Sequence, residues 1–311
     1  MNAYAWQAGS LRQNAYAKIN TYLEVLSRRP DGYHDLCSHM QLISLCDTLD
    51  VTVQLCPAQG VSVTLQCDHP QLSCGEDNLI VRAARAFCAA IDPGMGGIAI
   101  RFSLQKRIPM QGGLGGGSAD AAAALMALNR LCGAPMNTDQ LCALGATLGA
   151  DIPMCIRGNQ GPQTARGIGE LLSPAPGLAP DVTLLIVLPG TAVSTPAAFR
   201  LLDEGCTPQQ MEQREQALQQ RYAAHLQALA SGDMPVLALT SFNRFEEAVF
   251  ALQPQTAQVF ALLQSLQPDA VRMSGSGPTL VGYFASSERA AAAQRALQSR
   301  GLESVLCHPL A

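Results

Sequence analysis

The chain has 311 residues, of which 14% are charged, and a formal net charge of −4. A nucleic-acid-binding surface normally shows as a concentration of basic residues, so this balance argues against a nucleic acid partner. No run of about 20 apolar residues occurs, so we expect no membrane-spanning segment. Residues 1–12 lack a charged segment followed by an apolar core, which argues against secretion and for a cytoplasmic protein. The length suggests two domains.

The chain contains 11 cysteines and no Cys-x-x-Cys motif. We interpret them as reduced thiols, several of them buried. Cys67, His69 and Cys74 form the nearest approach to a metal-binding group, but their spacing does not match a zinc site, so none is expected.

Alternating side chains predict a strand over residues 15–25, in which Lys18, Asn20 and Tyr22 share one face. Residues 28–34 contain Pro-Asp-Gly, which is typical of a turn. The rest of this half is predicted to form strands over 51–55, 61–65 and 98–104, and helices over 77–91 (capped by Asp77), 119–131 and 138–148 (capped by Thr138).

The second half is richer in helices. Pro208 opens a Gln-rich helix that is predicted to run from 207 to about 230. The other predicted elements are strands over 182–188 and 280–284 and helices over 256–266 and 287–299. Strands followed by helices indicate an α+β protein with two domains, residues 1–165 and residues 166–311.

The most informative segment is a glycine loop, Pro109–Asp120, in which five of the six residues 112–117 are glycine. Such a loop before a helix exposes backbone N–H groups at the positive end of the helix dipole, so it predicts a phosphate site. It is neither a Walker A loop, because Ser118 stands where lysine is needed, nor a dinucleotide-binding fingerprint. A flexible linker or a tight helix–strand contact remains the alternative.

Two charged residues stand in unusual surroundings. Asp151 lies in Gly-Ala-Asp-Ile-Pro, and we expect Pro153 to keep Ile152 non-helical, so that Asp151 lies where the preceding helix ends. An anion is unfavourable at a helix C-terminus, which favours a functional carboxylate over a cap. Lys18 lies in an apolar strand and needs a partner, for which Asp151 is a candidate; a surface lysine on an edge strand is the alternative.

Four motifs in the same order resemble the GHMP kinases: Ala17-Lys18-Ile19-Asn20, the glycine loop from Pro109, the Asp151 segment, and Gly-Ser-Gly-Pro-Thr at residues 275–279. The continuation into Arg-x-Asp-Gly-Tyr-His at residues 29–34 resembles one branch, whose acceptor carries cytidine diphosphate. Taken alone, Tyr33 and His34 would be interpreted as surface residues of a turn, and the second glycine loop as a simple turn.

The resemblance implies an N-terminal domain like ribosomal protein S5 domain 2 and a ferredoxin-like C-terminal domain. It implies phosphorylation of the 2-hydroxyl of a cytidine diphosphate-linked methylerythritol by ATP with Mg²⁺, in non-mevalonate isoprenoid synthesis. It implies Lys18 and Asp151 as the catalytic pair and Asn20, Tyr33, His34, Thr195 and Phe199 as acceptor-binding residues. The implied ATP-binding residues are Pro109, Met110, Gln111, Gly112, Gly113, Leu114, Gly115, Gly116, Gly117, Ser118, Ala119, Asn78 and Lys106.

In the implied mechanism, Asp151 accepts the hydroxyl proton, Lys18 keeps Asp151 ionised, and Phe199 and Tyr33 stack on cytosine. Gln111 and Ala119 depart from the family pattern, and Ala119 removes a possible phosphate or magnesium contact, so no metal-binding residue is assigned. The chain is expected to be a monomer or homodimer. The rivals are another GHMP kinase, acting on a mevalonate derivative, homoserine or a sugar, and a non-catalytic module that binds RNA.

Overall fold

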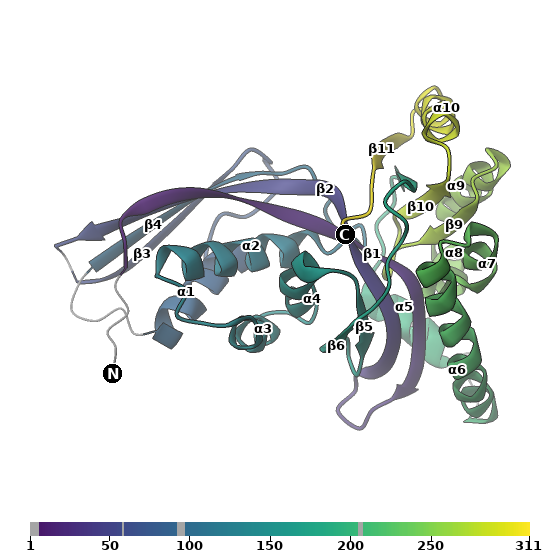
Figure 1. The fold of residues 1–311 in the computed structure, drawn as a ribbon, viewed down its shortest axis with the longest axis horizontal. Helices are drawn as coiled ribbons and strands as arrows, with labels where there is room; N and C mark the ends of the chain where they lie inside the picture. Colours follow the sequence, from purple (N-terminus) through teal and green to yellow (C-terminus); the bar gives the residue numbers. More distant parts are fainter. Residues whose placement is uncertain (1–5, 58, 92–96, 205–207) are drawn as a thin grey trace. The chain divides into compact units, whose positions relative to one another are not determined.

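The computed structural model describes residues 6–57, 59–91, 97–204 and 208–311 (Figure 1). The chain divides into two compact units, which are described one at a time. The first consists of Met1–Ala17, Leu45–Met110 and Gly115–Asn159, and the second of Lys18–Ser44, Gln111–Leu114 and Gln160–Ala311. The predicted division at residue 165 differs from this one, because residues 18–44 and 111–114 group with the C-terminal part.

The first unit contains parts of the long strands β1 and β2, which continue into the second unit. Its elements are β1 (Gly9–Arg28), β2 (His34–Cys56), β3 (Gly60–Cys67), α1 (Leu79–Ile91), β4 (Gly97–Gln105), α2 (Gly116–Leu131), α3 (Thr138–Ala146), α4 (Ile152–Arg157) and the 3-10 turn η1 (Gly158–Gln160).

A sheet and four helices build this unit. Strand β4 pairs antiparallel with β2, from Thr48 opposite Gln105 to Cys56 opposite Gly97, and parallel with β3. Helices α1 to α4 lie on one face of these strands (Figure 1). Alternate residues of β4 are buried, as the predicted alternation required. Most of the buried residues of α2 are alanines, and small side chains let this helix pack closely against α1 and α4.

Two predicted helix caps are wrong by one residue. Helix α1 is capped by Asn78, whose Oδ1 accepts from the Ile80 N–H at 2.9 Å, whereas the Asp77 carboxylate accepts from the Ser73 hydroxyl. Helix α3 is capped by Asn137 rather than Thr138, because Asn137 and Gln140 form a reciprocal capping box.

The second unit holds a four-stranded antiparallel sheet in the order β11-β7-β10-β9. This is the strand order of a βαββαβ unit, and it agrees with the expected ferredoxin-like architecture. The remaining elements are β5 (Gln163–Arg166), β6 (Leu171–Pro174), β7 (Thr183–Leu188), α5 (Thr195–Glu204), α6 (Pro208–Ser231), α7 (Met234–Thr240), β8 (Phe242–Asn243), α8 (Phe245–Leu252), α9 (Pro254–Ser265), β9 (Ala270–Met273), β10 (Leu280–Phe284), α10 (Ser287–Gln298) and β11 (Glu303–Cys307).

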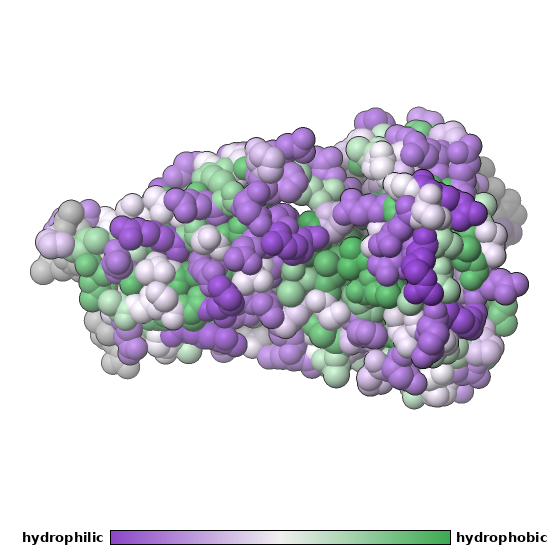
Figure 2. All heavy atoms as spheres, turned by 90° about the horizontal axis from the view of Figure 1, so that it is seen from above, coloured by the Kyte–Doolittle hydropathy of each residue, from purple (hydrophilic) through white to green (hydrophobic). Residues whose placement is uncertain are grey.

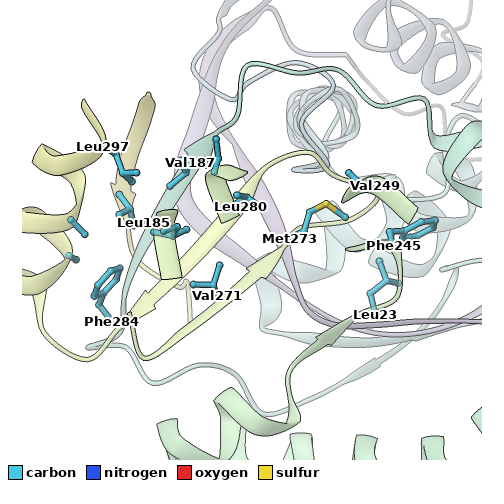
Figure 3. Packing of buried hydrophobic residues seen from close by; sticks show 14 of the residues in the cluster. Leu23, Leu185, Val187, Phe245, Val249, Val271, Met273, Leu280, Phe284 and Leu297 are labelled. Atoms are coloured by element: carbon cyan, nitrogen blue, oxygen red, sulfur yellow. The ribbon is translucent and has the colours of Figure 1, made fainter. Parts of the chain in front are cut away.

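One hydrophobic core fills the space between this sheet and its helices. Figure 3 shows side chains of β7, β9, β10 and α8 meeting in it, among them Leu185, Met273, Leu280 and Phe245. Burial of large apolar side chains is worth roughly 1.5–3 kcal/mol each, so this cluster dominates the stability of the unit. Thr207, the predicted start of the Gln-rich helix, lies outside the described residues.

A buried chain of hydrogen bonds ties β1 and β2 to α6. The Thr21 hydroxyl lies 2.7 Å from His39 Nδ1 and 2.8 Å from His225 Nε2, and His39 Nε2 lies 2.8 Å from the carbonyl of Pro176. Because a carbonyl only accepts, His39 Nε2 carries the proton and Nδ1 accepts from Thr21. His225 Nε2 then donates to the Thr21 oxygen, because the Thr21 proton is used on His39.

This histidine pair predicts an acid-sensitive fold. Burial lowers the pKa of His39 to about 4 and that of His225 to about 3, against an ordinary value of 6.5. The unfolded chain therefore binds more protons than the folded chain over this pH range. The free energy of unfolding decreases as pH falls below about 6.5. Protonation of His39 alone costs about 3 kcal/mol between pH 6.5 and 4. We expect the urea concentration at the midpoint of unfolding to decrease as pH is lowered from 6.5 to 4.

His225→Gln provides the matched variant, because a glutamine amide can still donate to Thr21 but does not titrate. The dependence of its urea midpoint on pH should be shallower than that of the parent. An equal pH dependence in both proteins would exclude His225 as a source of the acid sensitivity.

The surface is mixed in polarity. Figure 2 shows hydrophilic residues spread over the visible face with hydrophobic areas between them. Within the described ranges, no helix is long and apolar enough to cross a membrane. The ten cysteines of these ranges carry free thiols.

Candidate active site

The glycine loop turns into helix α2 through residues in left-handed backbone conformations. Gly115 is the N-cap residue of α2, with φ 71°, and it provides no side chain to cap the first turn. The N–H groups of this turn therefore point past a bare glycine, which is the arrangement that binds phosphate at helix N-termini. Gln111 also has a positive φ, of 54°, although it is not glycine.

Asp151 belongs to the first unit, as does the first turn of α2. A Cβ on Gly149 would lie 3.9 Å from Ser118 Oγ, so the turn that carries Asp151 contacts the start of α2. Helices α2 and α4 also pack together. The turn that precedes Asp151 therefore lies against the start of α2.

The predicted backbone around Asp151 is wrong. Asp151 occupies the N-cap position of α4, Ile152 is helical, and Pro153 lies in the first turn, where a missing N–H costs nothing. An anion is favourable at this end of a helix, so the electrostatic argument from a helix C-terminus does not apply. The Asp151 side chain makes no capping hydrogen bond, however, so capping does not account for it.

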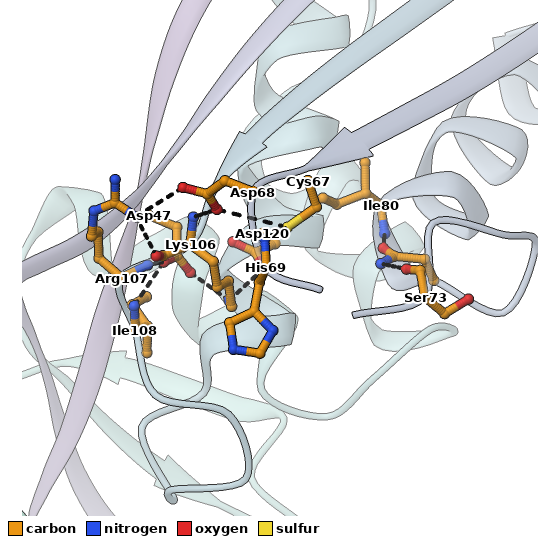
Figure 4. A network of polar contacts seen from close by, with 11 residues as sticks. Asp47, Cys67, Asp68, His69, Ser73, Ile80, Lys106, Arg107, Ile108 and Asp120 are labelled. Atoms are coloured by element: carbon orange, nitrogen blue, oxygen red, sulfur yellow. Dashed lines mark hydrogen bonds and ion pairs between the residues drawn. The ribbon is translucent and has the colours of Figure 1, made fainter. Parts of the chain in front are cut away.

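Lys106 lies in a buried ionic cluster next to the glycine loop (Figure 4). Its Nζ donates to Asp47 Oδ2 and to Asp120 Oδ2, the latter at 2.7 Å, and Asp47 Oδ1 accepts from the backbone N–H groups of Arg107 and Ile108. A Cβ on Gly116 would lie 3.2 Å from Lys106 Nζ. The cluster therefore fixes the end of β4 against the first turns of α2.

The charges of this cluster depend on one another. Burial raises the pKa of Asp120 to about 7, against the opposing effect of Lys106. Burial lowers the pKa of Lys106, but the two carboxylates outweigh it and raise that pKa above its ordinary value. Lys106 is therefore charged, and the pKa of Asp120 lies well above the ordinary value of a carboxyl.

Asn78, another predicted ATP-binding residue of this unit, directly precedes the helix α1, which starts near the first turn of α2. A Cβ on Gly117 would lie 3.6 Å from Leu79 Cδ1, so the start of α1 lies against α2. Asn78 immediately precedes it, and its amide nitrogen donates to the Ser73 carbonyl at 2.6 Å. Neither Asn78 nor Lys106 is shown to contact ATP, and both remain predicted adenosine neighbours.

In the second unit, Lys18 and Asn20 meet the second glycine loop. Lys18 Nζ donates to Asn20 Oδ1 at 2.9 Å, and the same oxygen accepts from the Gly275 N–H at 3.0 Å. The Lys18 backbone N–H donates to the Leu114 carbonyl at 2.9 Å. Asn20 Nδ2 donates to Ser38. The alternative of a surface lysine is excluded, because Lys18 is 5% exposed.

The predicted acceptor residues gather in the same unit. The His34 ring stacks on Phe199, with centroids 4.7 Å apart and planes 17° apart, and its Nε2 lies 2.7 Å from Asp203 Oδ1. Thr195 shares a hydrogen bond of 2.7 Å with Ser276. Tyr33 is 61% exposed.

Sequence reasoning missed Asp203, which orients His34, and the acidic cluster around Lys106. A signal existed for Asp203, because it follows Phe199 by four residues on α5 and thus shares its face. Lys18 and Asp151 belong to different units, so their pairing remains a prediction. Cys67 and His69 are engaged locally, with the His69 N–H donating to Cys67 Sγ.

Two domain families match the chain, the GHMP kinases N terminal domain over residues 78–159 and GHMP kinases C terminal over residues 226–302. The chain belongs to the GHMP kinase family. It is a small-molecule kinase with ATP as its co-substrate, and the expected α+β fold with two domains is confirmed.

The relatives carry a particular name. A 4-diphosphocytidyl-2-C-methyl-D-erythritol kinase from Desulfitobacterium hafniense (strain Y51) is 39% identical, over 89% of this chain and 88% of the relative. A crystal structure of 4-(cytidine 5'-diphospho)-2C-methyl-D-erythritol kinase is 33% identical with a TM-score of 0.73, over 96% of this chain and 99% of that one. A homoserine kinase from Cytophaga hutchinsonii has a TM-score of 0.74 at 18% identity, over 96% of this chain and 94% of that one, and shares the fold alone.

Proposed function

We propose that this kinase transfers the γ-phosphoryl group of ATP to the 2-hydroxyl of 4-diphosphocytidyl-2-C-methyl-D-erythritol, a step of non-mevalonate isoprenoid precursor synthesis. The relatives named for this substrate, at 39% and 33% identity over most of the chain, support the acceptor. The observation that carries the chemistry is the position of Gly149, two residues before Asp151, against Ser118 at the open N-terminus of α2.

The proposed steps use this chain's own groups. The N–H groups of the first turn of α2 hold the phosphates of ATP and stabilise the charge that spreads over the transferred group. Asp151 accepts the proton of the acceptor hydroxyl. Lys18 pairs with Asp151 in this proposal and orients its carboxylate.

Mg²⁺ is proposed to arrive with the nucleotide. Proteins usually hold this ion through one or two carboxylates together with substrate phosphates. The oxygens of Asp151 and Ser118, both residues of the first unit, are of the kind that fits that chemistry, whereas Asp120 is engaged by Lys106. The ion would neutralise charge on the phosphate oxygens. We assign no residue as its ligand.

Recognition of cytidine is assigned to the aromatic residues of the second unit. We expect Tyr33→Ala and Phe199→Ala to raise the KM for the acceptor by roughly 5- to 150-fold, because stacking on one aromatic ring is worth about 1–3 kcal/mol per base. The KM for ATP should hardly change. Steady-state kinetics with each substrate varied in turn measures both.

Tyr33→Ala is the cleaner variant of the two, because Tyr33 is exposed whereas Phe199 also packs edge-to-face on Phe245. Leu171→Ala removes an equally exposed side chain of the same unit and serves as the control. The cytosine site is assigned wrongly if neither aromatic variant changes the acceptor KM.

The proposal is tested by following ADP release from ATP with and without the cytidine diphosphate acceptor, and with unsubstituted methylerythritol in its place. We expect rapid release with the full acceptor only. Equal rates with unsubstituted methylerythritol would contradict cytidine recognition, and no acceptor-dependent release would favour a non-catalytic module. A cytoplasmic location and a monomeric or homodimeric state remain predictions.

A further inference from the structure

The second glycine loop, between β9 and β10, contacts the first one, backbone to backbone, within the second unit. A Cβ on Gly113 would lie 2.2 Å from the Ser274 carbonyl oxygen, and one on Gly275 would lie 2.8 Å from the Gly113 oxygen. The Ser274 hydroxyl also donates to the Gly113 carbonyl at 3.1 Å. The position of the second loop therefore constrains the first.

Asn243 holds the second loop from the side opposite Asn20. It is 3% exposed, and its amide nitrogen donates to the carbonyls of Met273 (2.6 Å) and Gly275 (2.8 Å). Its Oδ1 accepts from the Phe245 N–H at 2.9 Å. Both donors are used on the loop, so no shorter or anionic side chain can replace the amide there.

Strand pairing fixes Asn243 in turn. Strand β8 pairs in parallel with β1, and Asn243 lies opposite Leu23, three residues beyond Asn20 on the same strand. The neighbouring Glu246 accepts from the Met273 N–H at 2.9 Å. The loop is thus anchored to β1 through the segment that contains β8.

The Gly275 backbone is held from both sides, since its carbonyl accepts from Asn243 and its N–H donates to Asn20. We propose that Asn243 is a positioning residue for the kinase reaction: by fixing Gly275 it fixes Asn20, and through Asn20 Oδ1 the ammonium group of Lys18. This inference rests on the proposed catalytic role of Lys18. Asn243 itself touches no reacting group.

The test uses Asn243→Ser, which keeps one donor, and Asn243→Asp, which keeps the volume and loses both donors when ionised. Asn129 is the matched control, because it is also buried and its amide bonds the backbone of Met136 in both directions, at 2.9 and 3.0 Å. The same two substitutions are made there. Urea unfolding shows which variants are folded. One folded Asn243 variant is sufficient for the kinetic comparison.

We expect the Asn243 variants to lower kcat by about 10- to 100-fold at saturating substrates, since small displacements of catalytic groups have effects of this size. The Asn129 variants should keep kcat. In an Asn20→Ala background the Asn243 substitution should cost less than about twofold, because the link to Lys18 is already broken. The full kcat loss in that background, or equal losses at Asn129 and Asn243, would overturn the proposal.

A second measurement is independent of activity. Hydrogen exchange of the Gly275 amide, followed by NMR on the full chain, should accelerate in Asn243→Ser and not in Asn129→Ser. Unchanged exchange would overturn the positioning link even in an active kinase. Accelerated exchange in a chain that phosphorylates no acceptor would place the failure with the proposed function instead.

Discussion

Asp151→Asn is expected to lower kcat by about 100- to 10,000-fold, which is the usual contribution of a positioned general base. The amide has the shape of the carboxylate but cannot accept a proton at neutral pH. The fold should be unaffected, because the substitution keeps the size of the side chain. Binding of ATP should also be retained, because the phosphates are assigned to backbone groups of α2.

The measurement is a steady-state rate at saturating ATP and acceptor, together with ATP binding by calorimetry. Asp139→Asn is the control, since Asp139 is an exposed carboxylate of the same unit that pairs with Arg157 of α4. Near parental turnover by Asp151→Asn would contradict the role of base. A loss of only about tenfold would assign Asp151 to positioning instead.

Lys106→Met is expected to lower the free energy of unfolding by about 3–5 kcal/mol, which is the usual cost of removing one partner from a buried ionic cluster. Asp47 and Asp120 would be left facing each other, with side chains 0% and 5% exposed. The loss should grow as pH rises, because burial already raises the pKa of Asp120 and the variant lacks the Lys106 charge that opposes this rise, so that ionising Asp120 costs more.

Urea unfolding of four proteins tests this expectation: the parent, Lys106→Met, Asp120→Asn and the double variant. Lys106→Met combined with Asp120→Asn should recover part of the loss, because the second substitution removes one uncompensated carboxylate while Asp47 keeps its bonds to Arg107 and Ile108. Additive losses in the double variant, or a loss below about 1 kcal/mol for Lys106→Met alone, would contradict the account of the cluster.

Local patterns predicted the elements that depend on local chemistry. The alternation in residues 98–104 identified β4, because one set of alternate side chains must be buried. The short apolar run at 280–284 identified β10, in which all five residues are buried. The predicted cap residues of α1 and α3 were wrong by one position. Several polar side chains lie near each helix start, and only the folded backbone determines which of them caps the helix.

The sequence predicted those residues of the candidate site that belong to contiguous motifs. It did not predict the contacts between segments that are distant in the chain. Gly113 is required by the Ser274 backbone, 161 residues away, and no pattern within the first loop reveals this. Asn243 and Asp203 lie in segments without a glycine motif, and their partners come from other parts of the chain. The backbone of Asp151 was misjudged because Pro153 restricts a helix interior but is favourable in a first turn.

The central claim is tested most directly by competition in one vessel. The protein, ATP and Mg²⁺ are mixed with equal concentrations of 4-diphosphocytidyl-2-C-methyl-D-erythritol, mevalonate and homoserine, and the products are identified by mass spectrometry and phosphorus NMR. We predict a single phosphorylated product, the cytidine diphosphate compound with its new phosphate on the 2-hydroxyl. Phosphorylation of mevalonate or homoserine in preference to that compound, or phosphate at another hydroxyl, would contradict the account.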